Sequence, residues 1–245
     1  MFTIDRRRTQ VGQYLLTGSQ KLALMAGVSE SLAGRIGVAE LHTPSLGEIE
    51  RFLRLCAVRT GQRLSMNSFA AAIGGSPNTI RSRRSVLAAS NVVMLLEPYH
   101  RNLGKRVIKT PKLYLLDTGL ACFLAGLPDA RSLGQSGLLG GMFETLVLGQ
   151  IVRHYANRGE RPSISFFRDY AGSEVDFVVA RGKQVRLVEC KWSETPPTHQ
   201  RAFDELSLLL GAKTDVARTI VTPERVRRTV SGVEIVGCVD LAWLD

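Results

Sequence analysis

The sequence predicts a mixed α/β protein in which a basic helical module precedes a module built around a β-sheet. Amphipathic helical segments dominate residues 48–118, whereas residues 143–245 alternate helical segments with short runs rich in β-branched residues. Residues 48–118 also contain 12 Lys and Arg against 4 Asp and Glu, while residues 143–245 contain 14 of each kind. With 44% hydrophobic residues, a chain of 245 residues can bury a substantial core.

The composition argues against membrane, secreted and zinc-binding proteins. No apolar run approaches the ~20 residues of a membrane-spanning helix, and the N-terminus lacks the apolar stretch of a signal peptide. The cysteines stand far apart, as in buried thiols of a cytoplasmic protein without disulfides. We therefore expect a cytoplasmic protein that does not enter membranes and whose basic region binds a polyanion. The four cysteines are Cys56, Cys122, Cys190 and Cys238.

The basic region begins with three predicted helices. The first spans residues 49–59 and the second spans residues 65–73, before a glycine pair. Ser76 is the expected N-cap of the third helix, and Pro77 its first residue. In that helix Asn78, Arg81 and Arg84 lie away from the predicted apolar face.

A strand pair follows, at residues 92–98 and 107–116, with a basic turn between the strands. Three helices and a basic strand pair predict a winged-helix domain at residues 48–125, whose third helix enters the DNA major groove. Winged helices also dock to proteins, and the sequence leaves that alternative open. The residues expected to contact DNA are Asn78, Arg81, Arg84, Arg101, Lys105 and Arg106.

The second module centres on a predicted hairpin at residues 173–191, with Gly182-Lys183 as its two-residue loop. Counting outward from that loop places Asp176 opposite Glu189, about 5 Å away, and puts Lys191 on the same face. Such a group either binds a divalent cation or forms ordinary ion pairs. In the second case the two acids face solvent from an edge hairpin and Glu174 pairs with Lys191.

The remaining elements surround this hairpin. Residues 126–141 are rich in Gly, Ser and Leu and predict a connection between modules. A helix is expected from residue 141 to about residue 157, with Glu144 in its first turn, where the helix dipole favours a carboxylate. A strand at residues 164–168, a helix at residues 199–210 and strands at residues 218–221 and 233–239 complete the predicted sheet.

Residues 1–47 contain two strands of the buried type but too little chain to cover both faces of a parallel sheet. The Leu-Thr-Gly-Ser ending at Ser19 and the Glu-Ser-Leu-Ala-Gly-Arg run ending at Arg35 resemble the end of the ATPase domain in a prokaryotic family of AAA-type ATPases. The resemblance implies that Thr17 and Ser19 are nucleotide-sensing residues and that Arg35 senses phosphate. The chain has no phosphate-binding Gly-x-x-x-x-Gly-Lys-Ser/Thr loop, so we expect a truncated ATPase remnant that does not bind ATP alone.

The run Lys109-Thr-Pro-Lys-Leu-Tyr-Leu-Leu-Asp-Thr-Gly-Leu120 resembles the hallmark of a domain of unknown function that follows the ATPase core in the same family. This resemblance extends from about residue 48 to the C-terminus. It implies a complete ATPase protomer as a partner. Asp117 is expected to be structural, as the N-cap of a helix at residues 118–124.

A helical Glu144, then Asp176, then Glu189-x-Lys191 resembles the order of the PD-(D/E)xK nuclease superfamily. The resemblance implies a restriction-endonuclease-like domain at residues 126–245. In such a site Asp176, Glu189 and the backbone carbonyl of Cys190 hold Mg²⁺, Lys191 orients water or stabilises developing charge, and Glu144 binds a second ion or fixes the first ligands. The sequence thus predicts DNA binding with metal-dependent phosphodiester hydrolysis. The alternative is a non-catalytic DNA- or partner-binding module of an ATPase.

Overall fold

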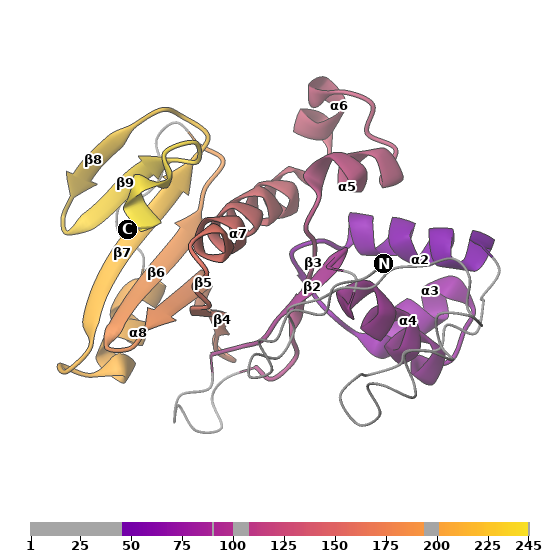
Figure 1. The fold of residues 1–245 in the computed structure, drawn as a ribbon, viewed down its shortest axis with the longest axis horizontal. Helices are drawn as coiled ribbons and strands as arrows, with labels where there is room; N and C mark the ends of the chain where they lie inside the picture. The colour runs from indigo at the N-terminus through magenta and orange to yellow at the C-terminus, as the bar shows by residue number, and fades with distance from the viewer. Residues whose placement is uncertain (1–45, 90, 100–107, 194–200, 245) are drawn as a thin grey trace, which may run out of the picture. The chain divides into compact units, whose positions relative to one another are not determined.

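The computed structural model describes residues 46–89, 91–99, 108–193 and 201–244, all within one unit of the chain, His42–Asp245 (Figure 1). This part is a mixed α/β structure with two sheets, as the sequence predicts. None of its helices is long and apolar enough to cross a membrane. Six of the predicted site residues lie outside the described residues, namely Thr17, Ser19, Arg35, Arg101, Lys105 and Arg106.

Three helices open the described chain, close to their predicted positions. The third begins where expected, because the Thr79 N–H donates to Ser76 Oγ at 3.2 Å and satisfies a free amide of the first turn. The helices share an apolar core in which the rings of Phe52 and Phe69 meet edge to face, 6.0 Å apart. The helices are α2 (Leu46–Val58), α3 (Met66–Ile73) and α4 (Pro77–Ala89).

A small antiparallel sheet packs with these helices. Its central strand, β3, lies between the other two and is buried along its whole length. Val93 pairs with Leu115 and Leu96 pairs with Lys112, which fixes the register of β2 against β3. The sequence prediction missed β1 because two polar residues carry no alternating pattern. The strands are β1 (Gln62–Arg63), β2 (Val93–Leu96) and β3 (Lys112–Leu115).

Three further helices follow, α5 (Thr118–Leu124), α6 (Ala130–Gln135) and α7 (Leu139–Asn157). Asp117 caps α5 as predicted, accepting from the Leu120 N–H at 2.8 Å, whereas α6 lies where only a connection was expected. Helix α7 lies so close to Thr60 that a Cβ on Gly141 would stand 2.6 Å from the Thr60 carbonyl oxygen. One turn later the hydroxyls of Thr60 and Thr145 form a buried hydrogen bond of 2.7 Å. Helix α7 is therefore anchored to the chain segment between α2 and β1.

The second sheet has six strands in the order β4-β5-β6-β7-β9-β8. The β6–β7 and β7–β9 pairs are parallel and the other pairs are antiparallel. Helix α7 and the short helix η2 (Leu241–Leu244) share an apolar core with one face, and α8 (Arg201–Leu210) shares a core with the other. The strands are β4 (Ser163–Arg168), β5 (Glu174–Arg181), β6 (Gln184–Cys190), β7 (Asp215–Thr222), β8 (Arg227–Val230) and β9 (Val233–Gly237).

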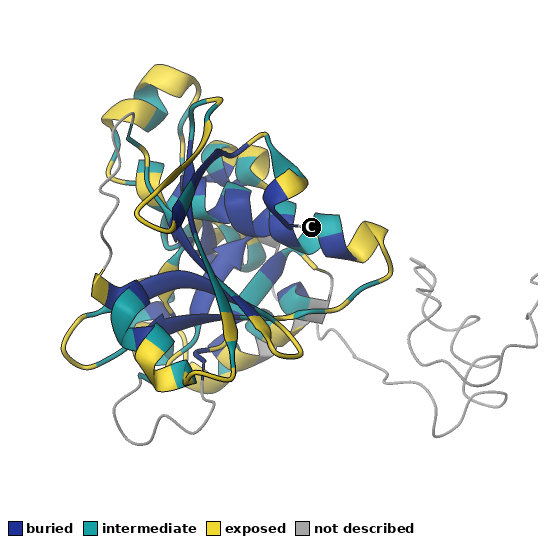
Figure 2. Cartoon of the chain, turned by 90° about the vertical axis from the view of Figure 1, so that its left-hand side faces the viewer, coloured by how far each residue is buried: buried dark blue, intermediate teal, exposed yellow. Residues whose placement is uncertain are grey.

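Burial on both faces explains the near-continuous apolar runs in β5 and β6. Buried residues concentrate along these strands and along the inward side of α7 (Figure 2). The sequence prediction missed β8, whose four residues are all exposed and therefore show no apolar pattern.

The chain on either side of residues 100–107 runs along β4, the first strand of the large sheet. The Tyr99 N–H donates to the Phe166 carbonyl at 2.7 Å, and the Ile108 N–H donates to the Arg168 carbonyl at 3.0 Å. The β2–β3 connection therefore approaches the six-stranded sheet before β3 returns to its own sheet. This path brings Lys112, the first residue of β3, close to Phe166 near the end of β4 and to Glu174 at the start of β5.

Candidate functional site

Strands β5 and β6 form the predicted hairpin in the predicted register. Arg181 pairs with Gln184 across the turn, and Gly182 has φ +63°, a conformation that favours glycine. At the open end of the hairpin the Cys190 N–H donates to Asp176 Oδ2 at 2.8 Å. The hairpin therefore holds Asp176 against the last residues of β6.

The acids of this hairpin are enclosed by protein. Asp176 is 6% exposed and Glu189 is 8% exposed, and both belong to internal strands. Lys191 donates to Glu189 Oε1 at 2.7 Å, while Glu174 pairs with Arg168 and Lys112. Ion pairs therefore form, as one of the two predictions has it, but its details are wrong: the acids do not face solvent from an edge hairpin, and Glu174 does not pair with Lys191.

Glu144 joins the same group from α7. The helix begins at Leu139, two residues earlier than predicted, so Glu144 lies in its second turn and not at the dipole end. The predicted dipole explanation for this carboxylate is therefore wrong. Instead the Tyr114 hydroxyl donates to Glu144 Oε2 at 3.0 Å, from the central strand of the small sheet.

Lys112, at the start of β3, was not predicted as a site residue, yet its ammonium group lies among the acids. Lys112 Nζ is 2.6 Å from Glu174 Oε1, 3.4 Å from Glu144 Oε2 and 3.7 Å from Asp176 Oδ1. The residue is only 4% exposed, and its ammonium stands over the Phe166 ring at 5.5 Å from the centroid. We call Glu144, Glu174, Asp176 and Glu189 the carboxylate cluster.

Burial and repulsion between the acids raise the pKa values of three members of the carboxylate cluster. Burial, and then the charge of Asp176, raises the pKa of Glu144 to about 8 and that of Glu189 to about 7. Burial also raises the pKa of Asp176 above its ordinary value. These acids are therefore harder to ionise than exposed carboxyls, mainly because burial removes the water that would stabilise their charge.

For Glu174 and Lys112, the effect of ion pairing on the pKa outweighs the effect of burial. Burial alone would raise the pKa of Glu174, but Lys112 and Arg168 outweigh it and hold that pKa below its ordinary value. Burial alone would lower the pKa of Lys112, but the surrounding carboxylates raise it overall. Lys112 therefore stays a cation throughout the physiological pH range.

The donor set suits magnesium in kind, because carboxylate oxygens are its preferred protein ligands. Within the described ranges, however, no three His, Cys, Asp or Glu side chains are arranged to hold a metal ion. The Lys112 ammonium stands where three of the acids converge, and one oxygen of Asp176 already accepts from the Cys190 amide. These side chains would have to turn toward a cation before they could bind it. The predicted ligand role of the Cys190 carbonyl stays a prediction.

Lys112 and Tyr114 have a recognisable signal in the sequence. They stand two residues apart in a short strand with leucines between and after them, so both side chains point to one face. A lysine inside a buried strand requires an acidic partner. That argument predicts a buried ion pair, although it does not identify the partner.

Three of the residues predicted to contact DNA lie on α4. Asn78 and Arg81 are exposed there, and Arg84 is partly exposed. Between them in sequence, Arg83 donates to the Glu48 carboxylate at 2.8 Å and so belongs to an ion pair with α2. The described part of the predicted DNA-contacting set therefore lies on one helix. Nothing in the geometry tests whether it binds nucleic acid.

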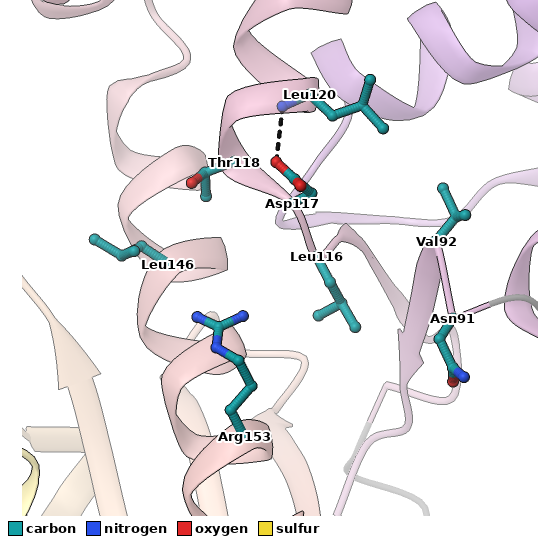
Figure 3. A pocket seen from close by; sticks show the side chains of 8 residues that line it. All are labelled: Asn91, Val92, Leu116, Asp117, Thr118, Leu120, Leu146 and Arg153. Carbon is teal, nitrogen blue, oxygen red and sulfur yellow. Dashed lines mark hydrogen bonds between the residues drawn. The ribbon is translucent and has the colours of Figure 1, made fainter.

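A separate hollow of about 540 Å³ lies between the small sheet, the start of α5 and helix α7. Figure 3 shows Arg153 directed into this space beside Leu146, with Asp117 occupied in capping α5. None of the predicted site residues lines it. The lining residues are Asn91, Val92, Leu116, Asp117, Thr118, Leu120, Leu146 and Arg153.

Two family comparisons match successive parts of this chain. Residues 38–131 match the family described as Domain of unknown function (DUF8612), and residues 139–240 match Domain of unknown function (DUF4143). The predicted domain boundaries, after residues 47 and 125, stay predictions.

Individual relatives add no assigned activity. Uncharacterized proteins of Mycobacterium bovis and Mycobacterium tuberculosis are each 30% identical over 136 residues, or 56% of this chain. The chain spans only 30% of the length of these relatives. The crystal structure of protein VC1899 from Vibrio cholerae is 13% identical, covering 84% of this chain and 56% of the other, with a TM-score of 0.27. The described chain is thus a mixed α/β protein made of two successive regions that resemble domains of unknown function.

Proposed function

We propose that this protein binds DNA and hydrolyses phosphodiester bonds with a divalent cation, through a PD-(D/E)xK-type site. One observation carries the proposal. The order of four residues in the sequence matches that superfamily, and they come from helix α7, strands β5 and β6 and the position directly after β6: Glu144, Asp176, Glu189 and Lys191. Their side chains nevertheless gather at one place: Asp176 and Glu189 are almost fully buried, Glu144 and Asp176 lie 3.4 and 3.7 Å from the same Lys112 ammonium, and Lys191 pairs with Glu189 at the rim.

Each residue of the proposed site has a separate role. Asp176 and Glu189 supply carboxylate ligands, together with the Cys190 carbonyl, and Glu144 completes the ligand set under the control of Tyr114. A bound Mg²⁺ supplies Lewis-acid stabilisation of the scissile phosphate. Lys191 is about one-third exposed at the rim of the site, where its ammonium can orient the attacking water. The water oxygen would bond to phosphorus as the bond to the leaving oxygen breaks, and the proton that the water loses would neutralise that leaving oxygen.

The region before α7 has features of a DNA-binding domain, which would bring the DNA substrate to the proposed site. The elements follow in the order α2, β1, α3, α4, β2 and β3, and the strands form an antiparallel sheet of order β1-β3-β2, an arrangement consistent with a winged helix. The third helix, α4, presents Asn78 and Arg81 to solvent. The positive balance of residues 48–118 favours a polyanion as the partner.

A second candidate function is a non-catalytic DNA- or partner-binding module of an ATPase, and Lys112 favours it. The buried Lys112 lies within 3.7 Å of three carboxylates, while Arg168 pairs with Glu174 and Lys191 pairs with Glu189, which gives an ion-pair group that needs no metal. In this function the cluster joins the two sheets and performs no chemistry. A complete ATPase protomer is then the proposed partner, since this chain lacks a phosphate-binding loop.

Calorimetric titration of the full chain with Mn²⁺ or Mg²⁺ distinguishes the two functions. We expect the wild type to bind the cation, and the isosteric variants Asp176→Asn and Glu189→Gln to bind at least about tenfold more weakly, because each loses a charged ligand. Asp215→Asn is the matched control, since Asp215 is exposed at the far end of the sheet's strands. Its affinity should equal that of the wild type.

Cleavage is measured on the same four proteins with labelled single-stranded and double-stranded DNA. The proposal requires cleavage that depends on the cation and disappears in Asp176→Asn while DNA binding persists. Cation binding that is equal in all four proteins, or DNA binding without cleavage of any substrate, would support the non-catalytic module instead.

A further inference from the structure

We propose that the Lys112 ammonium and a divalent cation are alternative occupants of the carboxylate cluster, so that Lys112 has to withdraw before the site binds metal. This inference rests on the proposed function. It adds a residue from the small sheet that controls cation binding in the large one, and it predicts a metal site that is weak in the wild type and strong without Lys112.

The geometry makes the two occupants exclusive. Acids from two elements, Glu144 of α7 and Asp176 and Glu174 of β5, surround Lys112 Nζ at 2.6 to 3.7 Å. A cation held by Glu144 and Asp176 would lie within a few ångströms of that ammonium. Two positive charges at such a distance in an enclosed site repel strongly. Because Lys112 is almost fully buried, water cannot screen that repulsion.

The side chain of Lys112 can move while its backbone stays in place. In β3 the residue pairs with Leu96 on one side and Arg63 on the other, so its Cα is fixed within the small sheet. Four methylene groups separate that Cα from the ammonium, and rotation about them requires no change in the strand. Withdrawal of Lys112 is therefore a side-chain movement.

The carboxylates are not equally affected by this withdrawal. Glu174 also pairs with Arg168, so it keeps a cation when Lys112 leaves. Glu144 and Asp176 then keep no direct ion pair among the residues described; the Tyr114 hydroxyl and the Cys190 amide still donate to them, and the charge of Lys191 still acts on Asp176 from a greater distance. Both acids that lose their ion pair are among the ligands that the proposed function assigns to the metal. A divalent ion bound between Glu144 and Asp176 would supply the positive charge that Lys112 takes away when it withdraws.

The test compares Mn²⁺ binding by the wild type, Lys112→Met, Lys112→Arg and Lys183→Met, measured by calorimetry on the full chain. Methionine keeps most of the lysine stem without its charge. Lys112→Met should bind Mn²⁺ at least about tenfold more tightly than the wild type, because the competing state has been removed. Lys112→Arg keeps the charge and should gain no affinity. Lys183 is exposed in the β5–β6 turn, and Lys183→Met should match the wild type.

A second measurement uses the wild type and needs no folded variant. Reductive methylation with mass-spectrometric detection reports which lysines reach solvent. Lys112 should be protected without Mn²⁺ and should become reactive when Mn²⁺ saturates the protein, whereas Lys183 should react equally in both conditions.

The outcomes separate this inference from the proposed function. Equal Mn²⁺ affinity in the wild type and Lys112→Met, with Lys112 protected at saturation, would overturn the exchange of cations and leave the metal-dependent function standing. Absence of Mn²⁺ binding in both proteins would overturn the metal site and the exchange together. Tight binding by Lys112→Met that Asp176→Asn abolishes in the double variant would support both.

Discussion

The ammonium of Lys112 lies 2.6 Å from the carboxylate of Glu174, so a buried ion pair joins the central strand of the small sheet to β5 of the large one. A buried ion pair contributes little net stability, because desolvation of both charges offsets their attraction. Loss of one partner is costly, however, since the other charge stays buried. The main effect of the pair is therefore to determine which parts of the two sheets meet.

Gly141→Ala should destabilise the protein by about 1–3 kcal/mol, as expected for overpacking. The new Cβ would stand 2.6 Å from the Thr60 carbonyl oxygen, and neither backbone can easily give way. Gly140→Ala is the matched control in the same helix, because a Cβ there meets no atom within 4 Å. It should be neutral or slightly stabilising. Urea unfolding of the three proteins measures the difference, and equal losses in both variants would contradict the close approach.

Thr60→Val should destabilise the protein by about 1–3 kcal/mol. The Thr60 hydroxyl accepts from the Leu115 N–H at 3.2 Å and bonds to the Thr145 hydroxyl at 2.7 Å. Valine keeps the shape but leaves the buried Leu115 amide without its acceptor. Thr110→Val is the control because Thr110 is exposed. Thermal unfolding should show a lower midpoint for Thr60→Val alone, and an unchanged midpoint would show that water replaces the hydroxyl.

The metal-free protein should lose stability as pH rises from about 5 to about 8. The pKa values of Glu144, about 8, and of Glu189, about 7, lie above those of the unfolded chain, near 4.5. In this interval the folded state binds more protons than the unfolded state, so the free energy of unfolding falls with increasing pH. Urea unfolding across the interval measures the slope.

The same titration in Glu144→Gln and Glu189→Gln identifies the groups. Each variant should have a flatter dependence of unfolding free energy on pH than the wild type, because one proton-binding group is absent. A stability that does not change with pH over this interval in the wild type would show that the folded acids ionise as readily as exposed ones.

Arg81→Ala should weaken DNA binding across unrelated sequences and reduce the slope of log affinity against log salt by about 1, as expected for a lost phosphate contact. Arg81 is exposed on α4. Arg131→Ala removes an exposed arginine of α6, outside the predicted helix–DNA interface, and serves as the control. Fluorescence anisotropy at several salt concentrations provides both values. An equal loss in the two variants would indicate general attraction to the basic surface and no specific role for α4.

Local signals in the sequence predicted the parts of the fold that depend on neighbouring residues. The turn at Gly182 set the register of β5 against β6, and the caps at Ser76 and Asp117 set the starts of α4 and α5. Elements with weak or short patterns were missed, as with β1, β8 and α6. The start of α7 was misplaced by two residues, which altered the explanation for Glu144.

The site was predicted only where it follows the order of a known superfamily. Glu144, Asp176, Glu189 and Lys191 were identified in that way, although their function remains a proposal. Lys112 and Tyr114 reach the carboxylate cluster from a different sheet. Contacts between sheets depend on packing over the whole unit, which no local pattern in the sequence encodes.

The six-stranded sheet has two lateral borders, and neither offers a long, uncharged edge to further strands. Along β4, the amides of Tyr99 and Ile108 already bond to its carbonyl groups. At the opposite border β8 has only four residues, all exposed, and begins with Arg227-Arg228. Charged or covered borders prevent one molecule from adding strands to another. If the amides of Tyr99 and Ile108 no longer donated to β4, the carbonyl groups of a strand that contains Phe166 and Phe167 would become free to pair with a second copy of the chain. Self-association of the protein would then begin before the fold is lost.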